Sequence, residues 1–152
     1  MPSFEIETPI DADPLTCFDL ARDIDFHVRS LVHTGEQAIA GVTTGLIGLD
    51  ETVTFRGKHF GVTQHLTSRI TRFDPPHHFR DEMTHGAFKR FAHDHFFDTV
   101  GSGTVMRDHL EFASPFGPIG FAVDRAFMTR YLRKLLAERA HLLKIEAEQQ
   151  NR

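Results

Sequence analysis

Residues 90–113 read RFAHDHFFDTVGSGTVMRDHLEFA and predict a β-hairpin with a mixed aromatic and titratable inner face. A two-residue turn at Gly101 and Ser102 pairs Val100 with Gly103. Counted up both strands, this register sets Phe91 opposite Phe112, His93 opposite Leu110, His95 opposite Asp108, and Phe97 opposite Met106. A slip of one residue would set the same face against Arg107, His109 and Glu111, which is a poor core. We therefore expect an inward pair of His95 and Asp108 with His93 beside it.

The preceding residues follow the two-residue period of strands, and the chain from Ala38 to Ala113 predicts a meander of five or six antiparallel strands. A tight turn near His59 and Phe60 would place Phe55 opposite Gln64, and Val53 opposite Leu66. Gln64 would then also face inward.

The sequence does not decide on which side of the sheet Phe79 and Asp81 lie. A two-residue turn at Gly86 and Ala87 would put them on the outer side, whereas a bulge near His85 would bring them inside. We treat Asp81 as an interior acid only under the second alternative.

Helical signals lie on both sides of this meander. A first strand alternates through Phe4–Ile10, and Asp13 followed by Pro14 is typical of a helix start, so two short helices should follow. After residues 114–118 the apolar period becomes helical, which predicts one long C-terminal helix. The apolar stripe of that helix contains Met128, Leu132, Leu135, Leu136, Leu142 and Leu143, with Arg139 in its middle. Arg139 either extends past the sheet edge or points its guanidinium at something inside.

Composition limits the classes of function. The 152 residues, 40% hydrophobic and 25% charged, fit a single domain over 1–152 with a core of about 3–147. A formal charge of −4 argues against a nucleic-acid partner. The lack of an apolar run of membrane length and of an N-terminal signal pattern predicts a cytoplasmic protein without an integral membrane segment. Cys17 lies on an apolar helical face and is expected to be a small core residue.

Three chemical interpretations compete for the inward pair. His93, His95 and Asp108 could form a two-His, one-carboxylate metal site, but a self-satisfied polar layer is favoured, so we expect no metal and no cofactor. A His95–Asp108 pair could instead serve as acid and base. We expect the histidines near strand ends or on the outward face to be exposed; they are His59, His65, His77, His78 and His85. The basic residues Arg125, Arg130, Arg133 and Lys134 should form the solvent face of the last helix.

Several stretches together resemble the SRPBCC superfamily, which includes START domains, relatives of the birch-pollen allergen and bacterial polyketide cyclase/dehydrase-like proteins. The resemblance covers nearly the whole chain. It is carried by residues 4–10 with Asp13-Pro14, by Ile70–Pro76, by Gly86-Ala87-Phe88, by Phe91–Phe97 and by Pro115–Gly120. A Trp that is frequent in that family after Gly86 is replaced here by Phe.

This resemblance implies an α+β helix-grip fold: a curved antiparallel sheet wrapped around the long C-terminal helix, with an apolar cavity between them. It transfers no catalytic residue. We expect the protein to bind a small hydrophobic or amphipathic ligand such as a lipid, isoprenoid, polyketide or aromatic metabolite. The expected ligand-binding residues are Phe55, Gln64, Phe79, Phe91, His93, His95, Phe97, Asp108, Leu110, Phe112, Met128, Leu132, Leu135 and Arg139.

Two alternatives remain. One is a cyclase or dehydratase that uses His95 and Asp108. The other is a filled core without a ligand, in a protein that acts as an interaction module. The sequence also leaves a homodimer open.

Overall fold

The computed structural model describes residues 2–114, 122 and 127–151 of the chain. Within these residues a seven-stranded antiparallel sheet has the strand order β1-β7-β6-β5-β4-β3-β2. The strands are β1 (Ser3–Ile10), β2 (Gln37–Gly41), β3 (Thr52–His59), β4 (Val62–Asp74), β5 (His78–His85), β6 (Arg90–Val100) and β7 (Gly103–Ala113). The helices are α1 (Pro14–Ala21), α2 (Ile24–Ser30), the 3₁₀ turn Val32–Thr34 and α4 (Thr129–Gln150). The expected α+β helix-grip fold is confirmed.

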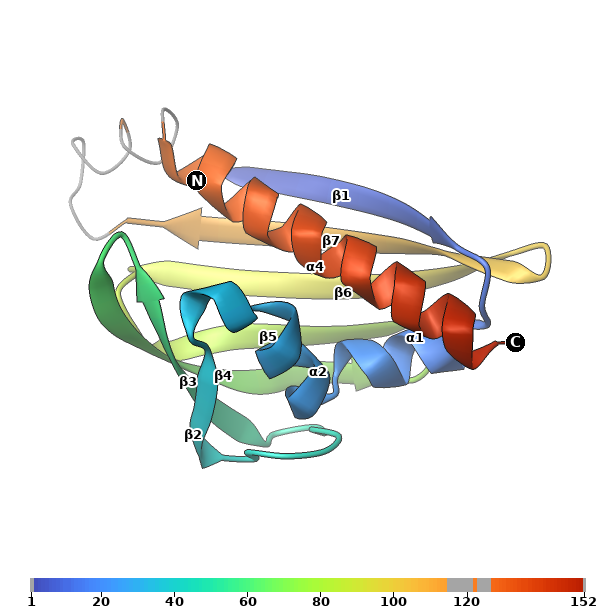
Figure 1. Ribbon diagram of the computed structural model, residues 1–152, viewed down its shortest axis with the longest axis horizontal. Coiled ribbons are helices and arrows are strands. Elements are labelled where there is room, and N and C mark those ends of the chain that lie inside the picture. Colours follow the sequence, from blue (N-terminus) through green and yellow to red (C-terminus); the bar gives the residue numbers. More distant parts are fainter. Residues whose placement is uncertain (1, 115–121, 123–126, 152) are drawn as a thin grey trace.

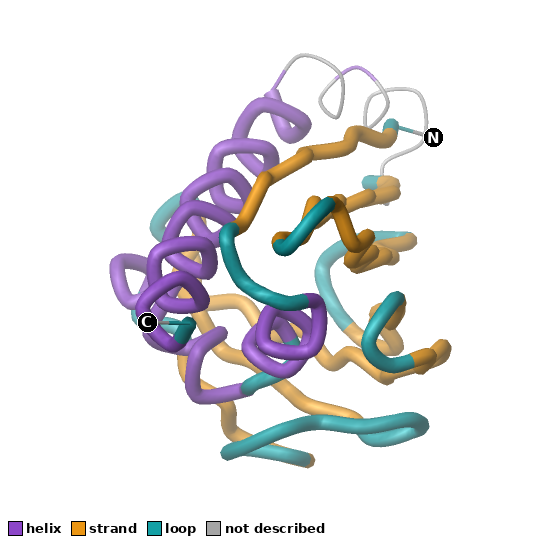
Figure 2. Tube along the Cα trace, turned by 90° about the vertical axis from the view of Figure 1, so that its right-hand side faces the viewer, coloured by secondary structure: helices purple, strands orange, loops and turns teal. Residues whose placement is uncertain are grey.

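The long helix α4 lies across the sheet, with α1 and α2 beside its C-terminal half (Figure 1). Turned by 90°, the molecule shows the helices gathered on one side and the strands curving around the other (Figure 2). The core between these layers is rich in Phe, as the composition suggested, and Phe18 packs edge-on against Phe79 and Phe97. Sheet curvature and helix packing therefore bury one apolar face of each element.

The hairpin of β6 and β7 has the predicted register throughout. Val100 pairs with Gly103, and His95 lies opposite Asp108. Gly101 has a φ of +60°, which suits a tight turn of this kind. The strong alternation along both strands determines the register because a slip would expose the Phe side chains.

The predicted register of β3 and β4 was wrong by two residues. Phe55 lies opposite Leu66, and Gln64 lies opposite Gly57. The turn is centred on Phe60 and Gly61, both with positive φ, and not on His59 and Phe60. A two-residue hairpin turn of this type favours Gly at its second position. A shift of two residues keeps each side chain on its face, and Gln64 does face the interior.

The open alternative for Asp81 is settled by the pairing of β5 with β6. Phe79 lies opposite His95, and Asp81 lies opposite His93, so both face inward. The connection between these strands spans four residues instead of two. A register irregularity near His85 is present, in the pairing of β5 with β4.

Several smaller predictions concern the helices. Asp13 and Pro14 do start α1, although the Asp13 side chain accepts from the Thr16 hydroxyl and not from a backbone N–H. Arg139 is 6% exposed and points inward. Cys17 is fully buried, and burial raises the pKa of its thiol to about 11.

The basic residues of the last helix divide between described and undescribed parts of the chain. Arg130, Arg133 and Lys134 are exposed as expected. Arg125 and the stretch 115–120 lie outside the described residues. None of the described helices is long and apolar enough to cross a membrane.

Candidate ligand-binding cavity

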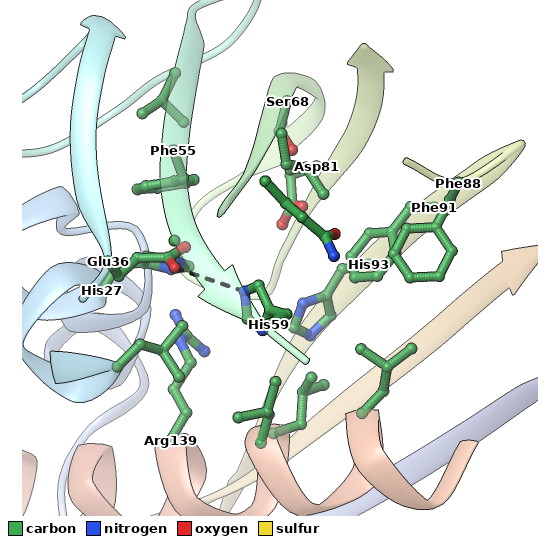
Figure 3. Close-up of a pocket in the computed structure, with 18 of the residues that line it drawn as sticks. His27, Glu36, Phe55, His59, Ser68, Asp81, Phe88, Phe91, His93 and Arg139 are labelled. Atoms are coloured by element: carbon green, nitrogen blue, oxygen red, sulfur yellow. Dashed lines mark ion pairs between the residues drawn. The ribbon is translucent and has the colours of Figure 1, made fainter. Parts of the chain in front are cut away.

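A cavity of about 480 Å³ lies between the sheet and α4, and most of its wall is apolar. Figure 3 shows polar side chains reaching into it from the strands, from α2 and from α4. Of the residues expected to bind a ligand, the following line it: Phe55, Gln64, Phe79, Phe91, His93, His95, Met128, Leu132, Leu135 and Arg139. A volume of this size is typical of sites for small organic molecules.

Four of the expected residues do not reach the cavity surface. Phe97, Asp108, Leu110 and Phe112 are fully or almost fully buried, and they lie outside its lining. Their strand positions do face inward, and the apolar ones pack in the buried core, with Phe97 in one cluster and Leu110 and Phe112 in another. They support the wall, and Asp108 acts on the cavity through the histidines it contacts.

The sheet contributes a cluster of four titratable side chains, Asp81, His93, His95 and Asp108, which we call the strand cluster. His93 Nε2 lies 2.9 Å from Asp108 Oδ1, and His95 Nε2 lies 2.8 Å from Asp81 Oδ2. The predicted partners His95 and Asp108 are 3.4 Å apart through Nδ1, without a hydrogen bond. The two imidazole rings stack with centroids 3.6 Å apart. The predicted cross-strand pair of His95 and Asp108 is thus present as an ion pair, while the hydrogen bond of Asp108 is made with His93.

The acids and histidines of the strand cluster shift the pKa values of one another. Burial alone would raise the pKa of Asp108, but its contacts with His93 and His95 hold it far below its usual range. The pKa of Asp81 is also lowered, because contacts with His95 outweigh the effect of burial. Burial would lower the pKa of His95, but Asp108 and Asp81 outweigh it and raise that pKa, whereas burial and the charge of His95 lower the pKa of His93. At neutral pH the cluster therefore holds two carboxylates, one imidazolium and one neutral imidazole.

Asp81, His93 and His95 also meet a geometric requirement for metal binding, since one ligand atom from each lies within 4.8 Å of the others. The sequence interpretation had named Asp108 where the structure has Asp81. Both Nε2 atoms are already hydrogen-bonded to carboxylates. The buried Nδ1 of His95, by contrast, has no hydrogen-bond partner in the described structure.

Arg139 brings a cation to the cavity from α4. Its Nη2 donates to the Ala21 carbonyl over 2.8 Å. Its Nε is buried and has no hydrogen-bond partner in the described structure. A buried N–H without an acceptor is costly, and Arg139 itself borders the cavity.

Sequence reasoning missed a second polar cluster, formed by His27, Glu36, His59 and Tyr131 and called here the Glu36 cluster. Glu36 Oε1 lies 3.5 Å from His27 Nε2, and its Oε2 lies 3.9 Å from His59 Nε2 (Figure 3). His59 Nδ1 lies 2.6 Å from the Tyr131 hydroxyl. Glu36 stands in a short connection without periodicity, so no sequence pattern pointed to it.

Gly57 on β3 makes room for this acid. A Cβ at position 57 would overlap the Glu36 carboxylate. A Gly in the middle of a strand weakens the strand, and it often marks a place where another group approaches the backbone closely. At Gly57 this group is the Glu36 carboxylate. An isolated Gly within a strand pattern was the available signal.

The histidines expected to be exposed behave differently from one another. His65, His77 and His85 are exposed, as predicted, although His65 borders the cavity. His59 lines the cavity, and His78 is half-buried against Asp94 at 2.7 Å. For these last two the prediction was wrong, because strand ends near turns still take a definite face.

Solved structures show what this architecture is similar to. The chain matches the ZhuI aromatase/cyclase of Streptomyces sp. R1128 with a TM-score of 0.79 and 12% identity, covering 99% of this chain and 96% of that one. It matches TTHA0849 of Thermus thermophilus with 0.72 and 18%, covering 93% and 97%. It matches Ara h 8.0201 with 0.65 and 12%, covering 93% and 97%.

The chain has the helix-grip fold, and its architecture is similar to that of these solved structures. The resemblance stated from the sequence is thus confirmed at the level of the fold. No protein-family model and no curated protein sequence matches the chain. Because a shared fold does not determine function, the function of this protein depends on the chemistry of its own cavity.

Proposed function

We propose that this protein binds a small amphipathic molecule in the cavity between the sheet and α4. The observation that carries the proposal is a mostly apolar cavity of about 480 Å³ into which buried polar groups converge. An apolar wall supplies affinity, and a few fixed polar atoms supply orientation.

Two polar groups suit a ligand oxygen or hydroxyl. Arg139 borders the cavity and carries a cationic guanidinium. Since Asp108 is ionised and accepts the Nε2 proton of His93, the neutral imidazole keeps its Nδ1 as an acceptor. Lipids, isoprenoids and polyketides with an oxygen function all offer such a combination, and the names of the ZhuI and Ara h 8.0201 neighbours are compatible with it.

The test is native mass spectrometry of protein taken from cell extract, joined to a thermal-shift screen of lipids and polyketide-like aromatics. We expect a bound species and at least one stabilising ligand. Ser68→Leu would place bulk in the cavity, whereas Arg69→Leu changes the exposed neighbour on the same strand. The first variant should lose the ligand and the second should keep it. Absence of any bound species and any stabilising compound would reject the proposal.

A cyclase or dehydratase is the second candidate, favoured by the hydrogen bond from His93 to Asp108 at 2.9 Å. It orients a neutral imidazole that lines the cavity, as a general base requires. In a dehydration, His93 would take the proton next to a ketone and return it to the departing hydroxyl, so that water leaves and a C=C bond forms.

This candidate is tested with 4-hydroxy-4-phenylbutan-2-one, whose loss of water creates a conjugated absorbance. His93→Gln and His95→Gln should both abolish turnover while affinity changes by less than about tenfold, or 1.4 kcal/mol. Equal loss of binding and turnover would instead make these histidines recognition residues. The wild-type protein must accelerate the reaction over buffer for the candidate to survive.

A further inference from the structure

The Glu36 carboxylate is loosely held compared with the acids of the strand cluster. Its side chain is 9% exposed, and it accepts from the Thr34 hydroxyl over 3.3 Å. Its contacts with His27 and His59 are longer still, at 3.5 and 3.9 Å. Charge-assisted hydrogen bonds are normally about 2.7–2.9 Å long. A carboxylate in this position retains capacity for a stronger donor.

Among the described residues, Glu36 forms ion pairs with two histidines and with no Lys or Arg. Contacts with His27 and His59 outweigh burial and lower the pKa of Glu36, so the group is ionised at neutral pH. Burial lowers the pKa of His27 and keeps this neighbour neutral. The positive charge of Arg139 is coupled to Asp108 and Asp81 instead. Glu36 therefore brings to the cavity a negative charge that no Lys or Arg of the described residues pairs with.

Aromatic surfaces flank this charge. His27 stacks on Phe55 with ring centroids 4.0 Å apart, and Phe60 packs on Tyr131 at 4.4 Å. The Tyr131 oxygen lies 2.6 Å from His59 Nδ1, and since a phenol oxygen has two lone pairs it keeps acceptor capacity whichever of the two atoms donates. Carboxylate, phenol oxygen and aromatic faces together suit an ammonium group.

We propose that the Glu36 cluster is a subsite for a protonated amine, and that the ligand carries this amine on an apolar body. The inference rests on the proposed binding function and specifies the ligand class. Gly57 supports it, because this position lacks the Cβ that would overlap the carboxylate.

A matched pair of probes tests the inference at pH 7: 2-(naphthalen-2-yl)ethylamine and the uncharged 2-(naphthalen-2-yl)ethanol. Calorimetry should give the amine an affinity at least tenfold above that of the alcohol. Glu36→Gln keeps the shape and removes the charge, so the two affinities should come within about twofold. Glu138→Gln removes a carboxylate from the outer side of α4 and should leave the preference intact.

Folding of each variant is checked by its thermal unfolding temperature. If Glu36→Gln fails to fold, Gly57→Ala displaces the acid by another route and should also remove the preference. Binding of the alcohol with no advantage for the amine, or a preference that persists in Glu36→Gln, overturns the inference and leaves the proposed function standing. Failure of both probes to bind overturns the inference and counts against the proposed function as well.

Discussion

The outer and inner faces of β5, β6 and β7 carry the same residue types in different surroundings. On the outer face, His78 Nε2 lies 2.7 Å from Asp94 Oδ1, and Arg80 Nη1 lies 2.7 Å from Asp94 Oδ2. Phe96 stacks on His78 with ring centroids 4.5 Å apart. This face thus has an imidazole, a carboxylate, a phenyl ring and a direct partner cation.

On the inner face, His95 pairs with Asp81 and His93 pairs with Asp108, and Phe79 stacks on His95 at 4.0 Å. Among the described residues, no arginine forms an ion pair with Asp81 or Asp108 as Arg80 does with Asp94. Arg139 interacts with these two acids only through a longer-range Coulomb attraction. A histidine therefore supplies the positive charge. The comparison teaches that the same His–Asp motif is a surface ion-pair network outside and a titratable network beside the cavity.

The largest expected difference between the faces comes from the stacked rings. Phe79→Ala should destabilise the fold by about 3–5 kcal/mol, since it removes a buried ring that contacts both Phe18 and His95. Phe96→Ala, on the half-buried outer side, should cost roughly 1 kcal/mol. Urea unfolding measures both, and equal losses would contradict the assignment of faces.

The acids give the next contrast. Asp108→Asn should cost about 3 kcal/mol, because it removes the anion that His95 and Arg139 depend on in a buried site. Asp94→Asn is a matched change on the opposite face of the same sheet, where water can approach Arg80, and should cost about 1 kcal/mol. The comparison uses free energies of unfolding at pH 7. A larger loss for Asp94→Asn would show that the outer network is the stronger one.

The smallest expected effect is a dependence on pH. Asp108 has a lowered pKa in the folded state, so its stabilisation is present above the unfolded value of about 3.9 and is lost as pH falls. His95 has a raised pKa, so its stabilisation is present below about 6.5 and is lost as pH rises through the folded value. The lowered pKa values of His27 and His93 act in the opposite sense, with stability lost as pH falls below about 6.5.

Taking the difference between wild type and Asp108→Asn isolates this contribution from the other histidines. The stability gap between them should shrink by about 1–2 kcal/mol as the pH is lowered from 5 towards 3. It should also narrow above neutrality as His95 loses its proton. Urea titrations at each pH give the difference in free energy of unfolding between the two proteins. A difference that stays constant with pH would mean that the histidines do not lower the pKa of Asp108.

The inner face could be predicted where alternation was unbroken. His93 and His95 were placed correctly because the Phe residues on either side of them leave a single workable register. The face of Asp81 depended on the length of one connection, which alternation does not encode. The hydrogen-bond partner of Asp108 was missed for another reason: register gives the residue opposite, whereas a side chain can reach the diagonal neighbour two positions away.

The Glu36 cluster was beyond sequence reasoning because its members come from unrelated elements. Glu36 precedes β2, His59 ends β3, and Tyr131 lies on α4 near the apolar stripe without belonging to it. Periodicity describes one element at a time, and these side chains meet only through the curvature of the sheet. The Phe60–Gly61 turn that positions His59 was also predicted one residue too early.

The contact between Gly57 and Glu36 predicts how positions 36 and 57 vary among homologues. A methyl group at position 57 would force the Glu36 carboxylate to shift from its present place against β3. The two positions should therefore have changed together: a homologue with an acid equivalent to Glu36 should have kept Gly at position 57, and one that acquired a side chain there should have lost the acid. This pair can serve as a marker that sorts related sequences by the charge of their cavity.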